Sequence, residues 1–92
     1  MIKSFKHKGL KLFYEKGKTA GIQTHHAKKL RMQLATIDTA NEIDDVNIAG
    51  FSLHRLKGER SNIWSISVNE NWRVTFEFKV GNAYILNYED YY

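Results

Sequence analysis

The end of the chain carries side chains that can transfer protons. Asp90 and the phenols Tyr91 and Tyr92 follow an apolar run that begins at Ile85. Chain ends usually fray unless a strand or helix ties them down, and a strand would hold these groups while leaving them open to a substrate. We therefore expect this end of the chain to form one wall of a functional groove.

A second group of candidate residues lies around a predicted glycine turn. His54 is followed by the cations Arg55, Lys57 and Arg60, with Gly58 among them. Histidine suits proton transfer near neutral pH, and arginine and lysine stabilise charge on a phosphate. His54 and Lys57 can face one groove only if the strand ends or bulges before Gly58. A purely structural role for a single strand histidine stays open.

Two helices are predicted in the first half of the chain. Leu10, Phe13 and Tyr14 recur at helical spacing, and Gly17 suits the left-handed residue that follows a helix. Thr24 is a candidate cap for a second helix, and a capping-box spacing over 39–42 predicts one further helical turn. The buried stripe of the second helix comprises Ala27, Leu30, Leu34 and Ile37.

The apolar period changes to two after Gly50. Residues 64–68 and 72–80 alternate apolar with polar side chains, which predicts antiparallel strands with one buried face. We therefore predict the α+β class, with N-terminal helices packed on one face of a mostly antiparallel, twisted β-sheet. At 92 residues, we expect residues 1–92 to form a single domain.

The turn residues predict a strand register. A three-residue loop at 69–71 would set Trp64 opposite Phe76 and keep the large apolar side chains on one face. A two-residue turn at 81–82 would set Arg73 opposite Asp90 on the other face. Asn71 and Tyr92 would lie just beyond that pair. A plain ion pair that holds the last strand is the structural alternative.

Charge and composition narrow the kind of partner. The net charge is +4, and the first 18 residues carry six lysines, among them Lys3 and Lys6, against one glutamate. One-sided positive charge favours a polyanion such as nucleic acid as the partner, although a solvated basic face would look the same.

Cysteine is absent, the start of the chain lacks the apolar run of a signal peptide, and no stretch is long enough to span a membrane. We expect a cytoplasmic protein.

Metal ligands are not apparent in the sequence. His25 and His26 are adjacent, so on a helix they would point about 100° apart and make a poor metal pair. His7 stands among lysines and is expected at the surface. The acidic residues of 38–45 fit a helix start. We expect no metal and no other cofactor.

Cutting of a phosphodiester without a metal points to RNA. The 2′-hydroxyl can attack the neighbouring phosphate if a base takes its proton, cations stabilise the transition state and an acid protonates the leaving oxygen. The candidates for proton transfer are His54, Asp90, Tyr91 and Tyr92. The candidate cations are Lys57, Arg60 and Arg73. The candidate RNA contacts are Asn71, Arg55, Arg60, Lys3, Lys6 and Tyr92.

Several segments, in this order, resemble the HigB-type toxins of the RelE superfamily. They are Met1-Ile2-Lys3-Ser4-Phe5, Leu53-His54 through Lys57-Gly58, Trp64-Ser65-Ile66, Asn71-Trp72-Arg73 with Phe76, and Asn87-Tyr88-Glu89-Asp90-Tyr91. The resemblance covers nearly the whole chain. It implies a RelE-like microbial ribonuclease fold and a toxin that cuts messenger RNA in the ribosomal A site and arrests translation.

The resemblance also implies partners and residue roles. The partners would be a HigA-type helix-turn-helix antitoxin, mRNA, and the ribosome with its 16S rRNA, contacted through the basic surface; DNA would be bound only through the antitoxin. His54, Asp90 and Tyr91 match active-site positions of the family, and Lys57, Asn71 and Arg73 match positions that line its groove. Tyr92 departs from the pattern, because close relatives end in histidine and a phenol titrates near pH 10.

Two other classes of function remain open from the sequence. One is a catalytically weak or silent module of the same fold that binds RNA or a partner protein. The other is a DNA-binding domain based on the lysine-rich start, although no recognition-helix arrangement supports it.

Overall fold

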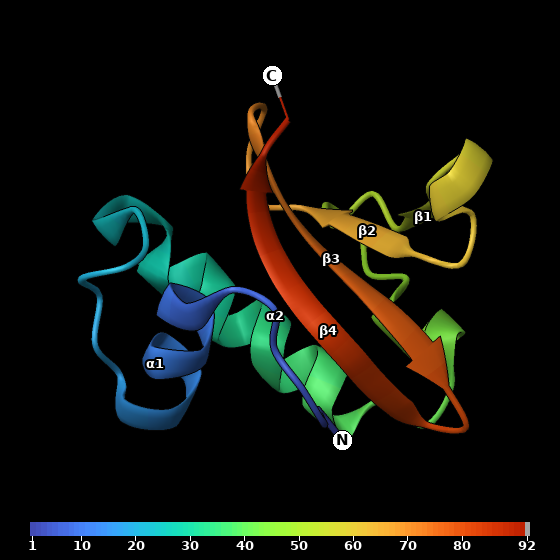
Figure 1. Ribbon diagram of the computed structural model, residues 1–92, viewed down its shortest axis with the longest axis horizontal. Coiled ribbons are helices and arrows are strands. Elements are labelled where there is room, and N and C mark those ends of the chain that lie inside the picture. Colours follow the sequence, from blue (N-terminus) through green and yellow to red (C-terminus); the bar gives the residue numbers. More distant parts are fainter. Residues whose placement is uncertain (92) are drawn as a thin grey trace.

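The computed structural model describes residues 1–91, in which two helices cover one face of a four-stranded antiparallel sheet (Figure 1). The strands follow one another in the order β1-β2-β3-β4. This arrangement confirms the predicted α+β class. The elements are α1 (Lys8–Lys16), α2 (Ala27–Thr39), β1 (His54–Arg55), β2 (Trp64–Ser67), β3 (Trp72–Lys79) and β4 (Asn82–Asp90), with 3₁₀ turns at Thr24–His26, Ile43–Val46 and Gly58–Arg60.

Helix α1 begins and ends largely as its sequence predicts. Leu10 and Phe13 are buried, and Gly17 ends the helix with a φ of 71° and an N–H that donates to the carbonyl of Phe13. No cap was predicted for the start of this helix. In the structure His7 is the N-cap, and its Nδ1 accepts the N–H of Leu10 at 2.9 Å. His7 was expected at the surface; its ring is half-buried there and also caps a helix.

Helix α2 has the predicted buried stripe and a different start. Leu30, Leu34 and Ile37 face the sheet, and Gln33 is buried among them. The prediction that Thr24 caps this helix was wrong, because Thr24 begins a 3₁₀ turn that runs into α2 and makes no capping contact to it. Within residues 1–91, no helix has the length and apolar character to cross a bilayer.

The short helical turn after α2 is confirmed, but its cap lies further along the chain. Glu42 and Asp45 form the capping box of the Ile43–Val46 turn. Thr39, the predicted cap, instead donates its hydroxyl back to the carbonyl of Ala35.

One apolar core joins the helices to the sheet. Its members come from both helices, the connection after α2 and the inner face of the strands. They include Leu10, Phe13, Leu30, Leu34, Ile37, Val46, Phe51, Ile66, Val74, Phe76, Leu86 and Tyr88. Near the start of the chain, residues 2–5 run beside β4 and form two isolated parallel bridges to it, Ile2 with Ala83 and Phe5 with Leu86.

The register between β2 and β3 confirms the prediction. Trp64 lies opposite Phe76 and Ile66 opposite Val74, across a loop at 69–71. In this loop Asn69 Oδ1 accepts the backbone N–H groups of Asn71 and Trp72 at 2.9 Å each. An asparagine side chain that bonds its own loop is a frequent way to close such a turn.

The register between β3 and β4 differs from the prediction, which was wrong about Asp90. The turn consists of Val80 and Gly81, both at positive φ, rather than 81–82. A bulge then adds Ile85, at φ 50°, to β4. This one added residue moves the following side chains of β4 to the other face of the sheet. As a result, Arg73 lies opposite Glu89, and Asp90 lies opposite Trp72 on the face that carries the helices.

Candidate nucleic-acid site on the helix-free face

The sheet has a helix-free face that carries polar side chains. Cross-strand partners share a face, so His54, Ser65, Thr75 and Asn87 form one row across all four strands. Ser67, Arg73 and Glu89 form the next row. The opposite face holds Trp72, Val74 and Tyr88 against the helices. The proton-transfer and cationic candidates can therefore be sorted by the face on which each lies.

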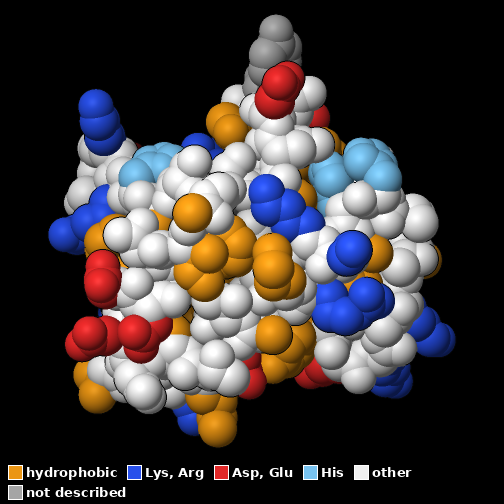
Figure 2. All heavy atoms as spheres, turned by 180° about the vertical axis from the view of Figure 1, so that it is seen from behind, with side chains coloured by type: hydrophobic (Ala, Val, Ile, Leu, Met, Phe, Trp, Pro, Cys, Tyr) orange, Lys and Arg blue, Asp and Glu red, His pale blue; other side chains and the backbone are white. Residues whose placement is uncertain are grey.

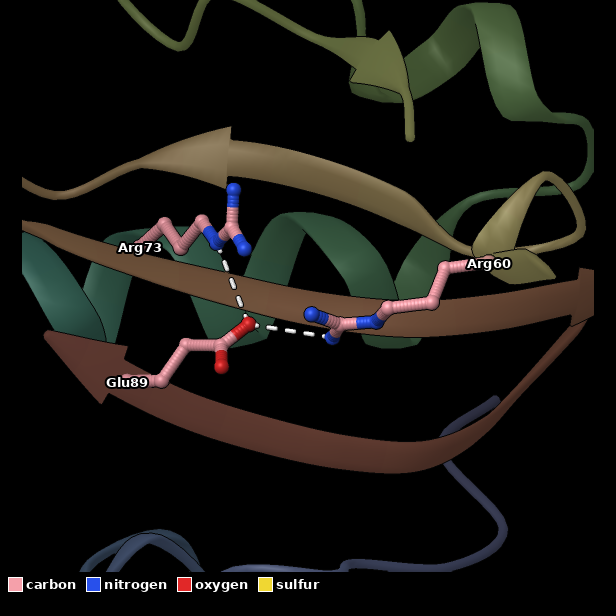
Figure 3. Close-up of polar contacts among 3 residues, drawn as sticks. All are labelled: Arg60, Arg73 and Glu89. Atoms are coloured by element: carbon pink, nitrogen blue, oxygen red, sulfur yellow. Dashed lines mark hydrogen bonds and ion pairs between the residues drawn. The ribbon is translucent and has the colours of Figure 1, made fainter. Parts of the chain in front are cut away.

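Two arginines converge on Glu89 (Figure 3). Arg73 Nε and Arg60 Nη2 each lie 3.1 Å from the same oxygen, Oε1 of Glu89. Arg73 comes from β3, whereas Arg60 comes from the turn between β1 and β2, 29 residues before Glu89. The β1–β2 connection is thus tied to the last strand. Asn62 of the same connection adds a second tie, a hydrogen bond to Glu77 on β3.

The electrostatics of this cluster favour an ionised carboxylate. Burial alone would raise the pKa of Glu89, but the hydrogen bonds from Arg60 and Arg73 outweigh it and lower the pKa. The side chain of Arg73 is 18% exposed and that of Glu89 26%, so both are partly shielded from solvent. Two guanidinium groups around one anion form a pattern that also fits a phosphate.

Tyr91 lies next to this cluster. The guanidinium of Arg73 stands 4.7 Å from the centre of the Tyr91 ring, a cation–π contact. The backbone N–H of Tyr91 donates to the carbonyl of Asn71 at 2.8 Å. Three sequence-predicted residues, Asn71, Arg73 and Tyr91, are therefore brought together.

His54 lies on the same face, in the neighbouring row. Its Nδ1 is 2.9 Å from the carbonyl of Ser52, which can only accept, so Nδ1 carries the proton and Nε2 is the open ring nitrogen. Strand β1 ends at Arg55, before Gly58. His54 and Lys57 could face one groove only if the strand ended there. Lys57 is exposed and directly precedes the Gly58–Arg60 turn.

The remaining predicted residues are spread around the site. Asp90 is exposed on the helix-bearing face, one residue beyond Glu89. Arg55 lies over the Trp64 ring at 5.5 Å, at the edge formed by β1. Lys3 and Lys6 are exposed on the segment that runs beside β4. Tyr92 lies outside the described residues.

Positive charge is distributed rather than confined to one stripe. Figure 2 shows the molecule from behind, with Lys and Arg side chains on both flanks of a hydrophobic middle. Acidic side chains gather towards one flank and near the C-terminal tip. A broad, moderate positive field suits contact with a large polyanion more than capture of one small anion.

A metal site would need several His, Asp or Glu side chains to lie close together. Among residues 1–91, no three His, Asp or Glu side chains come together in a way that could hold a metal ion. The carboxylate of Glu89, the acid at the centre of the site, faces two arginines.

Glu89 is the residue that the sequence reasoning missed. The signal was present in the alternation of β4, where buried Leu86 and Tyr88 alternate with Asn87 and Glu89. That pattern alone places Glu89 and Tyr91 on the face opposite the core, whereas the turn-based register placed Asp90 there. The burial pattern was the better guide.

The fold has a counterpart among solved structures. The chain superposes on the crystal structure of YafQ from E. coli strain BL21(DE3) with a TM-score of 0.59, covering 98% of this chain and 91% of that one at 14% sequence identity. At that identity the likeness concerns the fold alone, and it agrees with the RelE-like architecture inferred from the sequence.

Sequence comparison then identifies the family. The family described as RelE-like toxin of type II toxin-antitoxin system HigB matches residues 3–92. The chain is also 55% identical to the protein named Endoribonuclease HigB of Proteus vulgaris, over 92 residues and the full length of both. The chain belongs to the HigB-like toxin family, which confirms the resemblance seen in the sequence.

Proposed function

We propose that this toxin, an endoribonuclease, cuts messenger RNA on the ribosome at the helix-free face of its sheet, and that it does so without a metal ion. The observation that carries the proposal is the convergence of Arg60 and Arg73 beside Tyr91. Family membership and the relative from Proteus vulgaris support the activity. The chain would act as one domain over residues 1–92, in the cytoplasm, where translated messages are found.

In the proposed reaction the 2′-hydroxyl of the RNA attacks the adjacent phosphorus. The bond to the 5′-oxygen breaks, and a 2′,3′-cyclic phosphate and a 5′-hydroxyl result. Arg73, Arg60 and Lys57 would stabilise the negative charge that gathers on the phosphate oxygens. Glu89 would hold the two guanidinium groups until a phosphate takes its place.

Proton transfer would be shared among three side chains. His54 offers Nε2, because the carbonyl of Ser52 occupies Nδ1. Tyr91 would act beside Arg73, and Asp90 would approach from the end of β4. One group must take the 2′-proton and another must protonate the leaving oxygen.

Binding of the RNA would involve a wider set of residues. Asn71 is exposed beside Tyr91 and would contact a base or phosphate. Exposed aromatic rings such as that of Tyr91 can stack on unpaired bases. The other proposed contacts are Arg55, Arg60, Lys3, Lys6 and Tyr92.

A type II toxin has an antitoxin partner. We propose that this partner is a HigA-type helix-turn-helix protein, through which alone the toxin associates with DNA. The proposed ribosomal contact is 16S rRNA, bound by lysines and arginines such as those on both flanks of the face seen in Figure 2. Binding of this kind weakens steeply as salt rises, because released counterions drive it.

A second function is favoured by one specific observation. Asp90 lies on the face opposite Arg73, and Glu89 neutralises the two arginines in the cluster. Such a site could bind RNA or a partner with little or no catalysis. The alternative is thus a weak or silent binding module of the same fold.

Three single substitutions separate the two functions. We expect His54→Ala, Asp90→Ala and Arg73→Ala each to relieve growth arrest in cells and to lower cleavage of a translated message, while the proteins stay folded and bind the antitoxin. Arg31→Ala is a matched control, because Arg31 also lies over an aromatic ring, that of Phe13, but between the helices. If all three variants arrest growth as the unaltered protein does, the proposed site is wrong.

A further inference from the structure

His26 occupies a buried junction between the helices and the sheet. It ends the 3₁₀ turn that precedes α2, and its side chain is 4% exposed. Its Nδ1 lies 2.6 Å from the hydroxyl oxygen of Tyr88 on β4. Its Nε2 lies 2.8 Å from the amide nitrogen of Asn69 in the β2–β3 loop. One imidazole therefore joins two separate segments of the sheet.

The partners of Asn69 fix the tautomer of this ring. Oδ1 of Asn69 accepts two backbone N–H groups of its own loop, so the amide is oriented with Nδ2 towards His26. An NH₂ group can only donate, and Nε2 of His26 must accept. The ring proton is then on Nδ1 and is donated to Tyr88, whose oxygen also accepts the N–H of Gln23 at 3.2 Å.

The surroundings favour the neutral form of the ring. Burial lowers the pKa of His26, and the nearby His25 and Lys29 lower it further. Trp72 meets the His26 ring edge-on at 5.9 Å and stacks on Tyr88 at 4.5 Å. The titratable groups around it are His25 on its own 3₁₀ turn, Lys29 on α2, Tyr88 from β4, and His7, whose ring meets Tyr88 at 5.4 Å.

Both bonded segments lead directly to the candidate site. Asn69 closes the loop that carries Asn71, and the Asn71 carbonyl accepts the N–H of Tyr91. Tyr88 directly precedes Glu89, whose carboxylate holds Arg73. His26 itself belongs to the other side of the sheet, with the core residue Tyr88, and can act only through these neighbours.

We propose that His26 is a positioning residue: its neutral imidazole fixes the β2–β3 loop relative to the end of β4 and thereby sets the geometry of Asn71, Arg73 and Tyr91. The inference rests on the proposed function for its consequence in catalysis. Whether His26 fixes the β2–β3 loop relative to the end of β4 can be measured without any RNA.

Two substitutions divide the two hydrogen bonds of the ring. A glutamine oxygen can take the position of Nε2, so His26→Gln keeps the bond from Asn69 and loses that to Tyr88. An asparagine amide nitrogen can take the position of Nδ1, so His26→Asn keeps the bond to Tyr88. His26→Ala loses both. The control is His25→Ala, because His25 is exposed and its ring lies 4.3 Å from that of His26, yet it is neither of the two hydrogen-bond partners of that ring.

The first measurement is amide hydrogen exchange of Trp72 and Tyr91, whose N–H groups bond the loop. We expect exchange of both to speed up at least tenfold in His26→Ala, to stay near the unaltered rate in His25→Ala, and to recover for Trp72 in His26→Gln. Unchanged exchange in folded His26→Ala would overturn the inference. This result does not depend on whether the protein cuts RNA.

The second measurement is cleavage of a ribosome-bound message. We expect the single-turnover rate to fall about tenfold in His26→Ala, with RNA affinity within about threefold, and to recover in His26→Gln. Altered exchange with unaltered cleavage would overturn the link to catalysis and leave the proposed function standing. Cleavage that is lost in His54→Ala and Arg73→Ala but kept in His26→Ala would likewise overturn the link between His26 and catalysis.

A further variant guards against failure to fold. Asn69→Asp keeps the oxygen that closes the loop and presents a second acceptor to Nε2 of His26. We expect the imidazole to titrate at least one pH unit higher in Asn69→Asp than in the unaltered protein, followed by NMR of the ring protons. An unchanged titration would show that the tautomer and the bond from Asn69 are wrong.

Discussion

Arg73 on β3 and Glu89 on β4 lie directly opposite each other, with 3.1 Å between Nε and Oε1. The same oxygen accepts Arg60 from a distant turn, so one carboxylate organises two cations. The carboxylate stands where a phosphate would also be well neutralised. The proposed site therefore holds an internal anion that a substrate must replace.

The first prediction concerns the pH dependence of that carboxylate. The pKa of Glu89 is lowered in the fold, so the unfolded chain binds the proton more readily than the folded one. Its stabilising contribution is complete above the ordinary glutamate pKa and is lost as pH falls through the lowered value. We expect Glu89→Gln to remove this part of the acid-induced loss of stability, measured by urea unfolding between pH 7 and pH 3.

The size of this effect is modest, since partly exposed ion pairs contribute about 1 kcal/mol or less. Glu70→Gln is the control, because Glu70 is exposed in the β2–β3 loop and makes no ion pair in the described structure. Parallel pH curves for Glu89→Gln and the unaltered protein would contradict the prediction.

Tyr91 allows proton transfer and ring stacking to be separated. Tyr91→Phe keeps the ring beneath the Arg73 guanidinium and removes the hydroxyl. We expect it to lower the single-turnover cleavage rate about 100-fold with little change in RNA affinity, whereas Tyr91→Ala lowers both. Near-normal cleavage by Tyr91→Phe would show that the phenol transfers no proton.

His7 makes the start of α1 sensitive to acid. Its Nδ1 accepts the N–H of Leu10, and burial lowers its pKa, so protonation removes the cap. The stability from this cap is complete above the ordinary histidine pKa and is lost as pH falls through the lowered pKa of the folded protein. We expect His7→Asn to keep the cap at acidic pH and to flatten the stability curve between pH 7 and pH 5 by about 1 kcal/mol.

Thermal unfolding at each pH would measure this change. His26 titrates with the same sign, because its pKa is also lowered, so part of the acid sensitivity should persist in His7→Asn. His7→Ala, which removes the cap at every pH, should be less stable than the unaltered protein at pH 7. If His7→Ala and the unaltered protein were equally stable at pH 7, His7 would contribute no cap.

Val80 is strained at the tip of the β3–β4 hairpin. Its φ is 50° and its side chain is 98% exposed, so burial compensates none of the strain of a β-branched residue at positive φ. Asparagine followed by glycine is the preferred pair for such a turn. We expect Val80→Asn to raise the free energy of unfolding by about 1 kcal/mol in urea titration, with cleavage unchanged.

A smaller gain is expected for Val80→Ala, which relieves the branching but lacks the preference of asparagine for positive φ. A loss of stability in Val80→Asn would show that the tip makes a compensating contact.

The hairpin tip shows which part of the fold the sequence could not predict. Alternation of apolar residues was sufficient to assign the sheet and the pairing of Trp64 with Phe76. It could not foresee a two-residue turn that contains valine, because local preference argues for Gly81 and Asn82. The fold accepts strain at Val80 and a bulge at Ile85 while Leu86 and Tyr88 stay buried.

The candidate site was predictable in part for the same reason. The prediction that Asn71 and Arg73 meet the end of the last strand is confirmed, but the neighbour found there is Tyr91, whereas the predicted register named Asp90 and Tyr92. Asp90 was assigned to the wrong face by a shift of one residue, and Glu89 was overlooked. The role of His26 has no local signal, because its partners are 43 and 62 residues away in the chain.

In the proposed reaction the 2′-hydroxyl of the RNA, not a metal-bound water, attacks the phosphate. The most direct measurement is the chemistry of the cut ends on a translated message, compared with a message that carries a 2′-deoxy nucleotide at the cut position. We expect 2′,3′-cyclic phosphate and 5′-hydroxyl ends, and no cut at the deoxy position. Ends with a 3′-hydroxyl and a 5′-phosphate, or efficient cutting of the deoxy message, would contradict this mechanism.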